Sequence, residues 1–290
     1  MMTLNNANII QREIKTTRND LQPVNARLKG GKCVHCGKET KSHRIAIHGQ
    51  NNGVYLCNDC YNGILPRYHE SQRMGYHSAD GLRVTKDNIS IGQEFEIVGF
   101  NPFILAQFAF YGFKFEKDCT VTMEGISPIY TSMSGLSKIY GLCENYENNP
   151  NVDFSMKNSH CGLHTHFGYK NQPISYNIRN NCKELFQPIA DYIANLSIDK
   201  QRYFFGRALI DTAYVEQNIS EYNHYSIFNF EHTYTIEFRL LKFKNANDTA
   251  KMVKILRSVI SICFDNDGKL LNSTISKMMV EKLDNELRKF

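Results

Sequence analysis

Three short segments of the chain each place two chemically committed side chains two residues apart. The pairs are Glu94 with Glu96, His164 with His166, and Glu237 with Arg239. In a β-strand this spacing puts both members of a pair on one face, about 6.5–7 Å apart. The pattern therefore predicts three strands, and strands lying side by side would gather carboxylates, imidazoles and a guanidinium on one face.

The residues between the pair members indicate which face packs against the rest of the protein. Phe95 and Phe238 alternate with the acidic residues, so they are expected to point to the opposite, covered side of the sheet. Gathering several carboxylates costs Coulomb energy unless cations neutralise them. Oxygen ligands suit hard divalent cations, and the polar face is therefore a candidate metal site.

A fourth segment, 117–128, adds two more acids. Asp118 and Glu124 are separated by a stretch rich in β-formers, and Ser127-Pro128 closes it with a predicted turn. In this stretch we expect a further strand of the same sheet.

Taken in order, the four segments resemble the amidoligase family, a branch of the carboxylate–amine ligases related to glutamine synthetase. The resemblance covers about residues 88–245 and, more loosely, the remainder of the chain. Its motifs are a Gly-x-Glu-Phe-Glu strand, an acid-x5-Glu-x-x-Ser-Pro segment, Gly-Leu-His-x-His and Thr-Ile-Glu-Phe-Arg. Each motif alone is weak, and their order makes the set more specific.

The resemblance implies two divalent ions, Mg²⁺ or Mn²⁺, together with ATP. One ion would be held by Glu94, His164 and Glu237, and the other by Glu96, Glu124 and Asp118. His166 would approach the nucleotide phosphates, and Arg239 would stabilise charge on the transferred phosphoryl group. A carboxylate would be activated as an acyl phosphate and attacked by an amine to give an amide.

Two assignments within the resemblance stay open. Asp118 lies closer to Glu124 than the corresponding acids do in glutamine synthetase, so it could bind the amine instead. Asn229 matches a stretch before the last motif and would orient substrate or backbone. The carboxylate and amine are not specified, and a peptide or protein substrate is compatible with the pattern.

Each pair also has an ordinary explanation: a solvated strand face, a surface or zinc-binding histidine pair, or a salt bridge between Glu237 and Arg239. Two other functions follow from these. One is a non-catalytic zinc-ribbon protein with a degenerate ligase-like scaffold that binds nucleic acid or protein. The other is a metal-dependent hydrolase. The joint occurrence of the pairs favours the ATP-dependent ligase.

Two C-x2-C pairs predict a zinc ribbon over residues 30–62. Four thiolates from Cys33, Cys36, Cys57 and Cys60 would hold one Zn²⁺. Three histidines nearby could compete as ligands: His35, His43 and His48. Short strands are expected at 45–47 and 54–56. Such a module would contact nucleic acid or protein.

Charge and cysteine usage bear on partners and compartment. Residues 1–90 carry 13 Lys or Arg against 7 Asp or Glu, within a formal net charge of +5 for the chain. This excess weakly favours an acidic partner for the N-terminal region. An odd total of 9 cysteines without a signal peptide predicts a reducing, cytoplasmic location. Residues 100–113 are too short and too polar to span a membrane, so no membrane association is expected.

The predicted organisation is a polar arm at 1–28, the zinc ribbon at 30–62, a linker at 63–87 and a catalytic domain at 88–290. The catalytic domain is expected to be α+β, a curved, mostly antiparallel sheet covered by helices as in glutamine synthetase. Strands are predicted at 89–98, 113–117, 119–126, 152–156, 161–168, 225–231 and 233–243. Helices are predicted at 102–111, 134–147, 177–195 (kinked or interrupted at Pro188) and 200–216, with two more after Asn247 or Asp248 and after Ser273. The apolar rows of the last two are Met252, Val253, Leu256, Val259 and Ile260, and Ile275, Met278, Met279, Leu283 and Leu287.

Overall fold

The computed structural model describes residues 31–33, 38–41, 43–45, 54–60, 62, 89–98, 104, 108, 111–116, 121, 123–130, 132–148, 154–158, 161–170, 172–212 and 215–290. The predicted arm at 1–28 and linker at 63–87 lie outside these residues, as does most of the predicted helix at 102–111.

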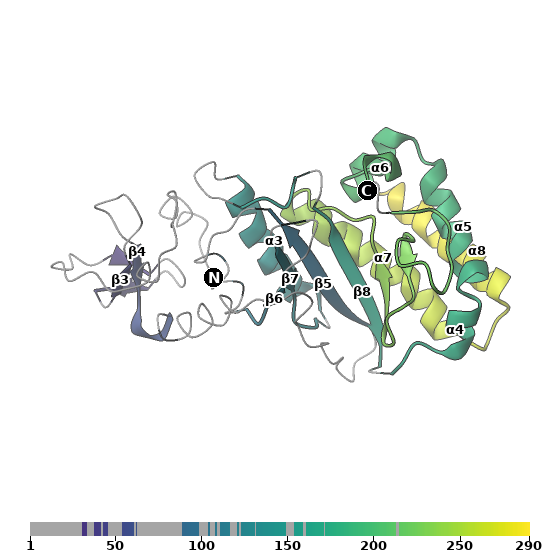
Figure 1. The fold of residues 1–290 in the computed structure, drawn as a ribbon, viewed down its shortest axis with the longest axis horizontal. Helices are drawn as coiled ribbons and strands as arrows, with labels where there is room; N and C mark the ends of the chain where they lie inside the picture. The colour runs from purple at the N-terminus through teal and green to yellow at the C-terminus, as the bar shows by residue number, and fades with distance from the viewer. Residues whose placement is uncertain are drawn as a thin grey trace. The chain divides into compact units, whose positions relative to one another are not determined.

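The α+β class is confirmed, with a six-stranded sheet in the order β6-β7-β5-β8-β10-β9 (Figure 1). These strands are β5 (Ile89–Ile97), β6 (Lys114–Glu116), β7 (Met123–Ile126), β8 (Leu163–Tyr169), β9 (Phe228–Asn229) and β10 (Thr235–Phe238). The pairings of β5 with β8, β8 with β10, β9 with β10 and β6 with β7 are all antiparallel.

The chain divides into two compact units. The first comprises residues 1–79, 97–126 and 142–156, and the second comprises residues 80–96, 127–141 and 157–290. Most of the predicted ligase-type residues belong to the second unit, whereas the cysteine pairs and Glu124 belong to the first.

The first unit contains short strands and an aromatic cluster. β1 (Gly31–Lys32) pairs with β2 (Glu39–Thr40), and β3 (His43–Ile45) pairs with β4 (Val54–Leu56). β3 thus begins two residues before the predicted strand at 45–47. Phe108 packs edge-on against Phe113, with ring centroids 5.1 Å apart, and stacks on Phe154 at 6.0 Å.

The second unit holds helices α4 (Tyr176–Asn180), α5 (Cys182–Asn195), α6 (Ile198–Phe205), α7 (Ala246–Asn266) and α8 (Asn272–Leu287), with the 3-10 helix η2 (Leu209–Asp211). Helix α3 (Met133–Glu147) begins in this unit as well. Helices α5, α7 and α8 pack together beside the sheet (Figure 1). No helix in the described part of the chain is long and apolar enough to cross a membrane.

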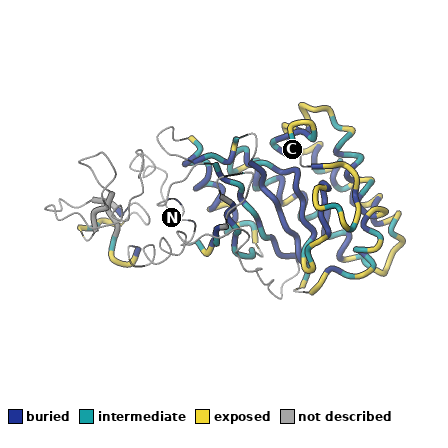
Figure 2. The backbone as a smooth tube through the Cα atoms, in the orientation of Figure 1, coloured by how far each residue is buried: buried dark blue, intermediate teal, exposed yellow. Residues whose placement is uncertain are grey.

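The covered face of the sheet is apolar, as the alternation predicts. Phe95 lies 6.3 Å from the ring of Tyr140 on α3, and Phe238 lies 5.8 Å from that of Phe205 on α6. Both phenylalanines are fully buried, and Figure 2 shows β5, β8 and β10 as largely buried strands. Burying each such ring contributes about 1.5–3 kcal/mol. This burial fixes the orientation of the strands, so the residues that alternate with the rings lie on the other face.

The predicted apolar rows of the last two helices are confirmed with one exception. Helix α7 buries five predicted residues: Met252, Val253, Leu256, Val259 and Ile260. Its N-cap is Asn245, whose side chain accepts from the backbone N–H of Asp248, so the helix begins earlier than predicted. In α8 the predicted core residue Met278 is instead 37% exposed.

Two helix predictions are wrong in their boundaries. The segment 200–216 stops being α-helical at Gly206, whose φ of +81° forms a left-handed C-cap. The segment 177–195 breaks at Asn181 into α4 and α5, and α5 continues through Pro188 rather than ending there. Pro188 is the seventh of the 14 residues of α5, so it removes one interior backbone hydrogen bond without ending the helix.

The predicted strands at 152–156 and in the last pair are longer than those observed. Among the described residues of 152–156, only an isolated bridge between Ser155 and Val98 forms. The strands predicted at 225–231 and 233–243 are reduced to β9 and β10. Arg239 lies just beyond β10, and its backbone N–H still donates to Ile227 O at 2.9 Å.

Candidate functional site

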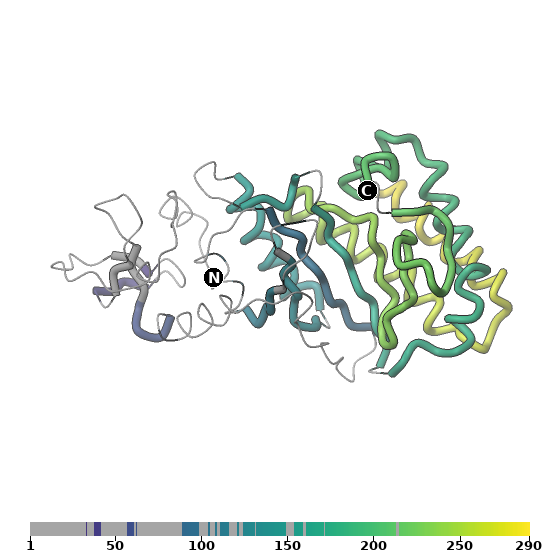
Figure 3. The backbone as a smooth tube through the Cα atoms, in the orientation of Figure 1, coloured from purple at the N-terminus to yellow at the C-terminus, as the bar shows by residue number. Residues whose placement is uncertain are grey.

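β8 lies between β5 and β10, and its register brings the predicted pairs together. Glu94 is opposite His164, and Glu237 is opposite His166. Opposed residues of an antiparallel pair have Cβ atoms about 4.5–5.5 Å apart. Figure 3 shows these strands, distant in sequence, side by side in space. The sheet therefore gathers the pairs on one face, as the spacing of two predicts.

His164 lies at the centre of this cluster and is buried. Its Nδ1 is 3.2 Å from Glu94 Oε2 and 3.2 Å from Glu237 Oε1. Its Nε2 is 3.5 Å from Glu96 Oε1. One imidazole thus contacts three carboxylates from two strands, and the sequence prediction that these residues share a face is correct.

His166 contacts a carboxylate of the same cluster. Its Nε2 lies 2.9 Å from Glu94 Oε1, yet this buried atom has no partner with hydrogen-bond geometry among the described residues. Its Nδ1 is 3.1 Å from Thr235 Oγ1. Burial lowers the pKa of His166, but the contact with Glu94 and the negative charges of Glu94 and Glu237 together outweigh burial and raise the pKa above its usual value.

Glu237 is the most deeply buried carboxylate of the cluster, at 0% exposure. Its Oε1 accepts from Arg239 Nη1 at 2.6 Å, and its Oε2 accepts from Asn229 Nδ2 at 2.8 Å and lies 3.0 Å from His232 Nε2. Burial opposes ionisation, but the His232 hydrogen bond and the Arg239 charge hold the pKa of Glu237 well below its usual range. Glu237 is therefore an anion in contact with Arg239, Asn229 and His232.

Glu94 is also held ionised. Burial would raise its pKa, but the charge of His166 and the hydrogen bond with His164 hold the pKa well below its usual value. Its side chain is 22% exposed, so of the two carboxylates that contact His164 Nδ1 it is the more accessible. In the absence of metal, imidazoles and guanidinium groups supply the positive charge that the carboxylates require.

Arg239 forms an ion pair with Glu237, and a second nitrogen of its guanidinium group has no acceptor in the described part of the chain. The side chain is largely buried, and its Nε has no acceptor among the described residues. A buried N–H without a partner costs about 1–3 kcal/mol. The group is thus suited to an anionic ligand.

The side chain of Glu96 lies close to the backbone of Gly162. The backbone N–H of Gly162 donates to Glu96 Oε2. A Cβ added at Gly162 would lie 2.9 Å from Glu96 Oε2, 2.9 Å from His164 Nε2 and 3.1 Å from Arg207 Nη2. The glycine before Leu163-His164 is therefore required by crowding around the two site residues.

Arg207, which sequence analysis missed, supports the end of the last motif. It is buried and donates to the backbone carbonyls of Arg239 and Leu240. Burial lowers its pKa to about 10, while the charge of Glu96 opposes that shift. It follows the Gly206 break in a segment predicted to be helical, so periodicity gave no signal for it.

A polar network on the covered side fixes the Ser-Pro turn. Gln93 N donates to Ser127 Oγ at 2.8 Å, and Ser127 N donates to Gln93 O at 2.8 Å. Tyr140 Oη donates to Gln93 Oε1 at 2.6 Å, and Gln93 Nε2 donates to Thr165 Oγ1 at 3.2 Å. The motif serine is thus a backbone anchor for β5 rather than a reacting group.

Two of the predicted ligase-type residues, Glu124 and Asp118, fall in the sequence range of the first unit. Glu124 is a buried residue of β7 in the first compact unit. Asp118 lies outside the described residues. His232 and Asn229, by contrast, are part of the cluster. The sequence indicates Asn229 as a residue that orients substrate or backbone. Sequence analysis missed His232, because it lies in a bend between β9 and β10 that carries no strand or helix pattern.

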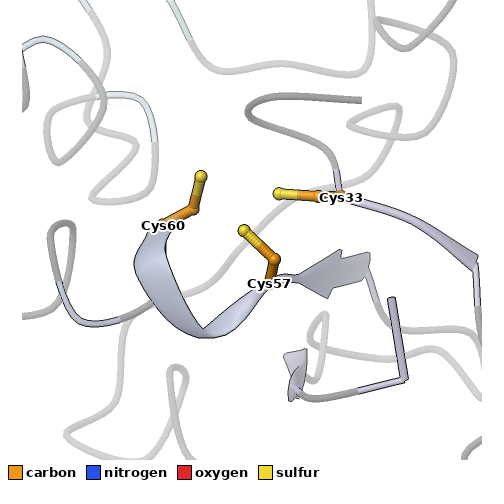
Figure 4. Close-up of side chains that lie close together, drawn as sticks. All are labelled: Cys33, Cys57 and Cys60. Carbon is orange, nitrogen blue, oxygen red and sulfur yellow. The ribbon is translucent and has the colours of Figure 1, made fainter. Parts of the chain in front are cut away.

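In the first unit, three of the four predicted zinc ligands come together. Cys33 and Cys60 are buried, Cys57 is partly buried, and the three Sγ atoms lie within 4.8 Å of one another. Figure 4 shows the three side chains pointing toward a common centre. Cys36, His35 and His48 lie outside the described residues. A convergent set of thiols fits the ligand preference of zinc.

The second unit offers oxygen and nitrogen ligands instead. The donor atoms of Glu94, His164 and Glu237 lie within 4.8 Å of one another, as do those of His166, His232 and Glu237. Two carboxylates with one imidazole fit a divalent cation such as Mg²⁺ or Mn²⁺. A scan against protein-family models finds no match for the chain, and a search of curated proteins finds no relative.

Proposed function

We propose that the protein is an ATP-dependent carboxylate–amine ligase that forms an amide bond through an acyl phosphate. The observation that carries this proposal is the convergence of Glu94, His164 and Glu237 on one face of three neighbouring strands. Together with the four motifs in their order, this face has the ligand set that such a ligase requires.

The carboxylates and His164 would hold a magnesium or manganese ion. Bound there, the ion would neutralise charge on the phosphoryl oxygens and on the substrate carboxylate. Glu94 is partly exposed and Glu237 fully buried, so Glu94 is the ligand nearer to solvent. Glu96, which contacts the other nitrogen of His164, would contribute to a second ion.

Arg239 supplies fixed positive charge beside this cluster. Its Nη1 is engaged by Glu237, and its Nε has no acceptor among the described residues. A planar guanidinium in this position would donate to the transferring phosphoryl group as its charge develops. His166, whose Nδ1 is positioned by Thr235, would lie on the side of the nucleotide phosphates.

Several groups hold these side chains in position without touching the reacting atoms. Arg207 clamps the backbone carbonyl of Arg239, and Gly162 permits the close approach of Glu96 and His164. Ser127 fixes β5 through paired hydrogen bonds with Gln93. Rigid placement of this kind is what a site built on strands provides.

For the first unit we propose a zinc ribbon in which Cys33, Cys57, Cys60 and Cys36 hold one ion. The convergence of three thiols supports this assignment. The ribbon would serve as a contact module for nucleic acid or protein, because a tetrathiolate site leaves no open position for catalysis.

The proposed activity is tested by phosphate release from ATP. The full chain is incubated with Mg²⁺, ATP and a panel of carboxylates crossed with amines. We expect release that depends on both a carboxylate and an amine, and that is lost in Glu94→Gln. Glu231→Gln is the matched control, since Glu231 is an exposed acid of the same unit that pairs with His224.

Two results would count against the ligase. Release that needs neither substrate would indicate a simple nucleotidase. Absence of release across the panel, together with no binding of Mg·ATP, would favour the non-catalytic scaffold.

A further inference from the structure

His166, His232 and Glu237 form a second set of ligands beside the carboxylate-rich one. Their donor atoms lie within 4.8 Å of one another. In a tetrahedral zinc site with bonds of about 2.1 Å, donors are roughly 3.4 Å apart, so small side-chain rotations would close this set. The two imidazole rings meet edge-on, with centroids 4.7 Å apart.

Glu237 turns a different oxygen toward each set. Its Oε1 faces His164 Nδ1 and Arg239 Nη1, whereas its Oε2 faces His232 Nε2 and Asn229 Nδ2. A carboxylate with this arrangement can bridge two cations, one on each oxygen. Asn229 would remain as the donor that orients Oε2.

One nitrogen of His166 lacks a hydrogen bond within the described part of the chain. His166 is about nine-tenths buried, and its Nε2 has no partner with hydrogen-bond geometry among the described residues. That nitrogen lies 2.9 Å from Glu94 Oε1, but outside the geometry of a hydrogen bond. Its other nitrogen is taken by Thr235 Oγ1, the outer contact that commonly orients a metal-bound histidine.

We propose that His166, His232 and Glu237 bind a borderline divalent transition metal of the zinc class, separate from the magnesium of the proposed ligase. Two imidazoles and one carboxylate favour Zn²⁺ or Co²⁺ over Mg²⁺, which prefers oxygen ligands and retained water. Three protein ligands leave a coordination position open. His232, with a side chain 39% exposed, lies on the side from which an oxygen ligand would enter.

The test is the number of Zn²⁺ ions bound per full-length chain, measured by elemental analysis after equilibration with Zn²⁺ in excess Mg²⁺. His232→Ala should bind one ion fewer than the wild type, because one of the three ligands is removed. The cysteine cluster is the same in both chains, so its zinc contributes equally to both counts. His224→Ala is the matched control: it lies in the same segment and contacts Asn229 and Glu231, and it should bind the wild-type number.

Two further variants guard against indirect effects. His232→Gln can keep a hydrogen bond to Glu237 while lacking the imidazole, so it should also lose one ion if the ring is a ligand. His164→Gln alters the carboxylate-rich set and should retain the ion that depends on His232. Circular dichroism verifies that each variant is folded.

Equal zinc content in wild type, His232→Ala and His232→Gln would overturn the proposal, as would displacement of the His232-dependent ion by Mg²⁺. Failure of the proposed ligase is a separate outcome. A chain that binds this ion but not Mg·ATP would retain the imidazole site and lose the ligase.

Discussion

The cysteine cluster of the first unit and the carboxylate–imidazole cluster of the second differ in what holds their side chains in place. The cysteines stand among strands of two or three residues. The acids and histidines stand on β5, β8 and β10, whose opposite faces bury Phe95, Phe167 and Phe238. In the first region metal would be part of folding, and in the second it would be part of chemistry.

The comparison shows why ligand type and scaffold go together. A module of about 30 residues buries too little apolar surface to fold without a covalent or metal cross-link. A sheet whose opposite face is packed against apolar side chains can instead tolerate the repulsion between neighbouring carboxylates. Active sites commonly lose stability in this way in exchange for function.

The largest effect is expected at the cysteine cluster. Cys60→Ser should abolish the proposed zinc binding and unfold the module, because the metal would supply the folding free energy of the module. Elemental analysis and amide hydrogen exchange, resolved by segment, measure both effects. Cys182→Ala, which changes a buried cysteine in α5, should keep its zinc, and exchange in the second unit should stay slow in both variants. If the amides of 54–60 stay protected from exchange without zinc, the first unit does not depend on metal for folding and does not differ from the second in this respect.

The second prediction concerns stability at the carboxylate cluster. Glu237→Ala leaves Arg239, Asn229 and His232 without their buried acceptor, so it should lower the free energy of unfolding by about 3–5 kcal/mol. Glu94→Ala removes a more exposed carboxylate and should have a smaller effect. Urea unfolding of the metal-free proteins measures the difference. Equal stability of the two variants would show that burial of Glu237 is not what fixes the cluster.

The third prediction separates a catalyst from a binding scaffold. Arg239→Lys keeps the charge but loses the planar fork. We expect it to lower the rate of amide formation by at least about a hundredfold, the lower range for loss of one oriented donor. Its affinity for Mg·ATP should change little. Single-turnover phosphate release measures the first quantity and calorimetry the second. Unchanged turnover would make Arg239 only a structural partner of Glu237.

The smallest effect tests a support of the second unit that needs no metal. Arg202 donates to both oxygens of Asp211, at 2.9 and 2.6 Å, and the backbone of Ala208 donates a third hydrogen bond at 2.8 Å. The Arg202 hydrogen bonds, followed by that of Ala208, lower the pKa of Asp211 to about 2.

A carboxyl with a lowered pKa stabilises the folded state above its unfolded pKa of about 3.9. This stability is lost as the pH falls from about 4 through about 2. Asp211→Asn should therefore cost up to about 1 kcal/mol at pH 7 and nearly nothing at pH 2. Thermal unfolding across this range measures it, with Asp199→Asn in the same helical region as control. A cost that does not change with pH would mean that the pairing is not ionic.

Much of the site face could be predicted because strand periodicity is a local property. The alternation of Glu94 and Glu96 with Phe95, and of Glu237 with Phe238, fixes which side chains face together once the strands pair. Stability was harder to predict. From the sequence alone, Glu94 and Glu237 look equivalent, and removal of either would be expected to leave the fold intact. Only the structure distinguishes a partly exposed carboxylate from a fully buried one.

What could not be predicted depends on chain breaks and long-range contacts. His232 follows β9 in a bend, where no repeating pattern marks its direction. Arg207 follows Gly206, whose positive φ ends the helix that an extended apolar pattern predicts through 216. Asn181 likewise ends α4 where continuous periodicity predicts one helix. His232 and Arg207 reach the site through tertiary contacts, which a local sequence pattern does not predict.

The central claim is that the carboxylate–imidazole face of the second unit binds a divalent metal together with a nucleotide. Calorimetric titration of the full chain with ATP, in the presence and absence of Mg²⁺, tests it most directly. We predict saturable binding that requires Mg²⁺ and is weakened at least about tenfold, equivalent to about 1.4 kcal/mol, in Glu94→Gln but not in Glu231→Gln. Binding of equal strength without Mg²⁺, or unaffected by Glu94→Gln, would contradict the claim.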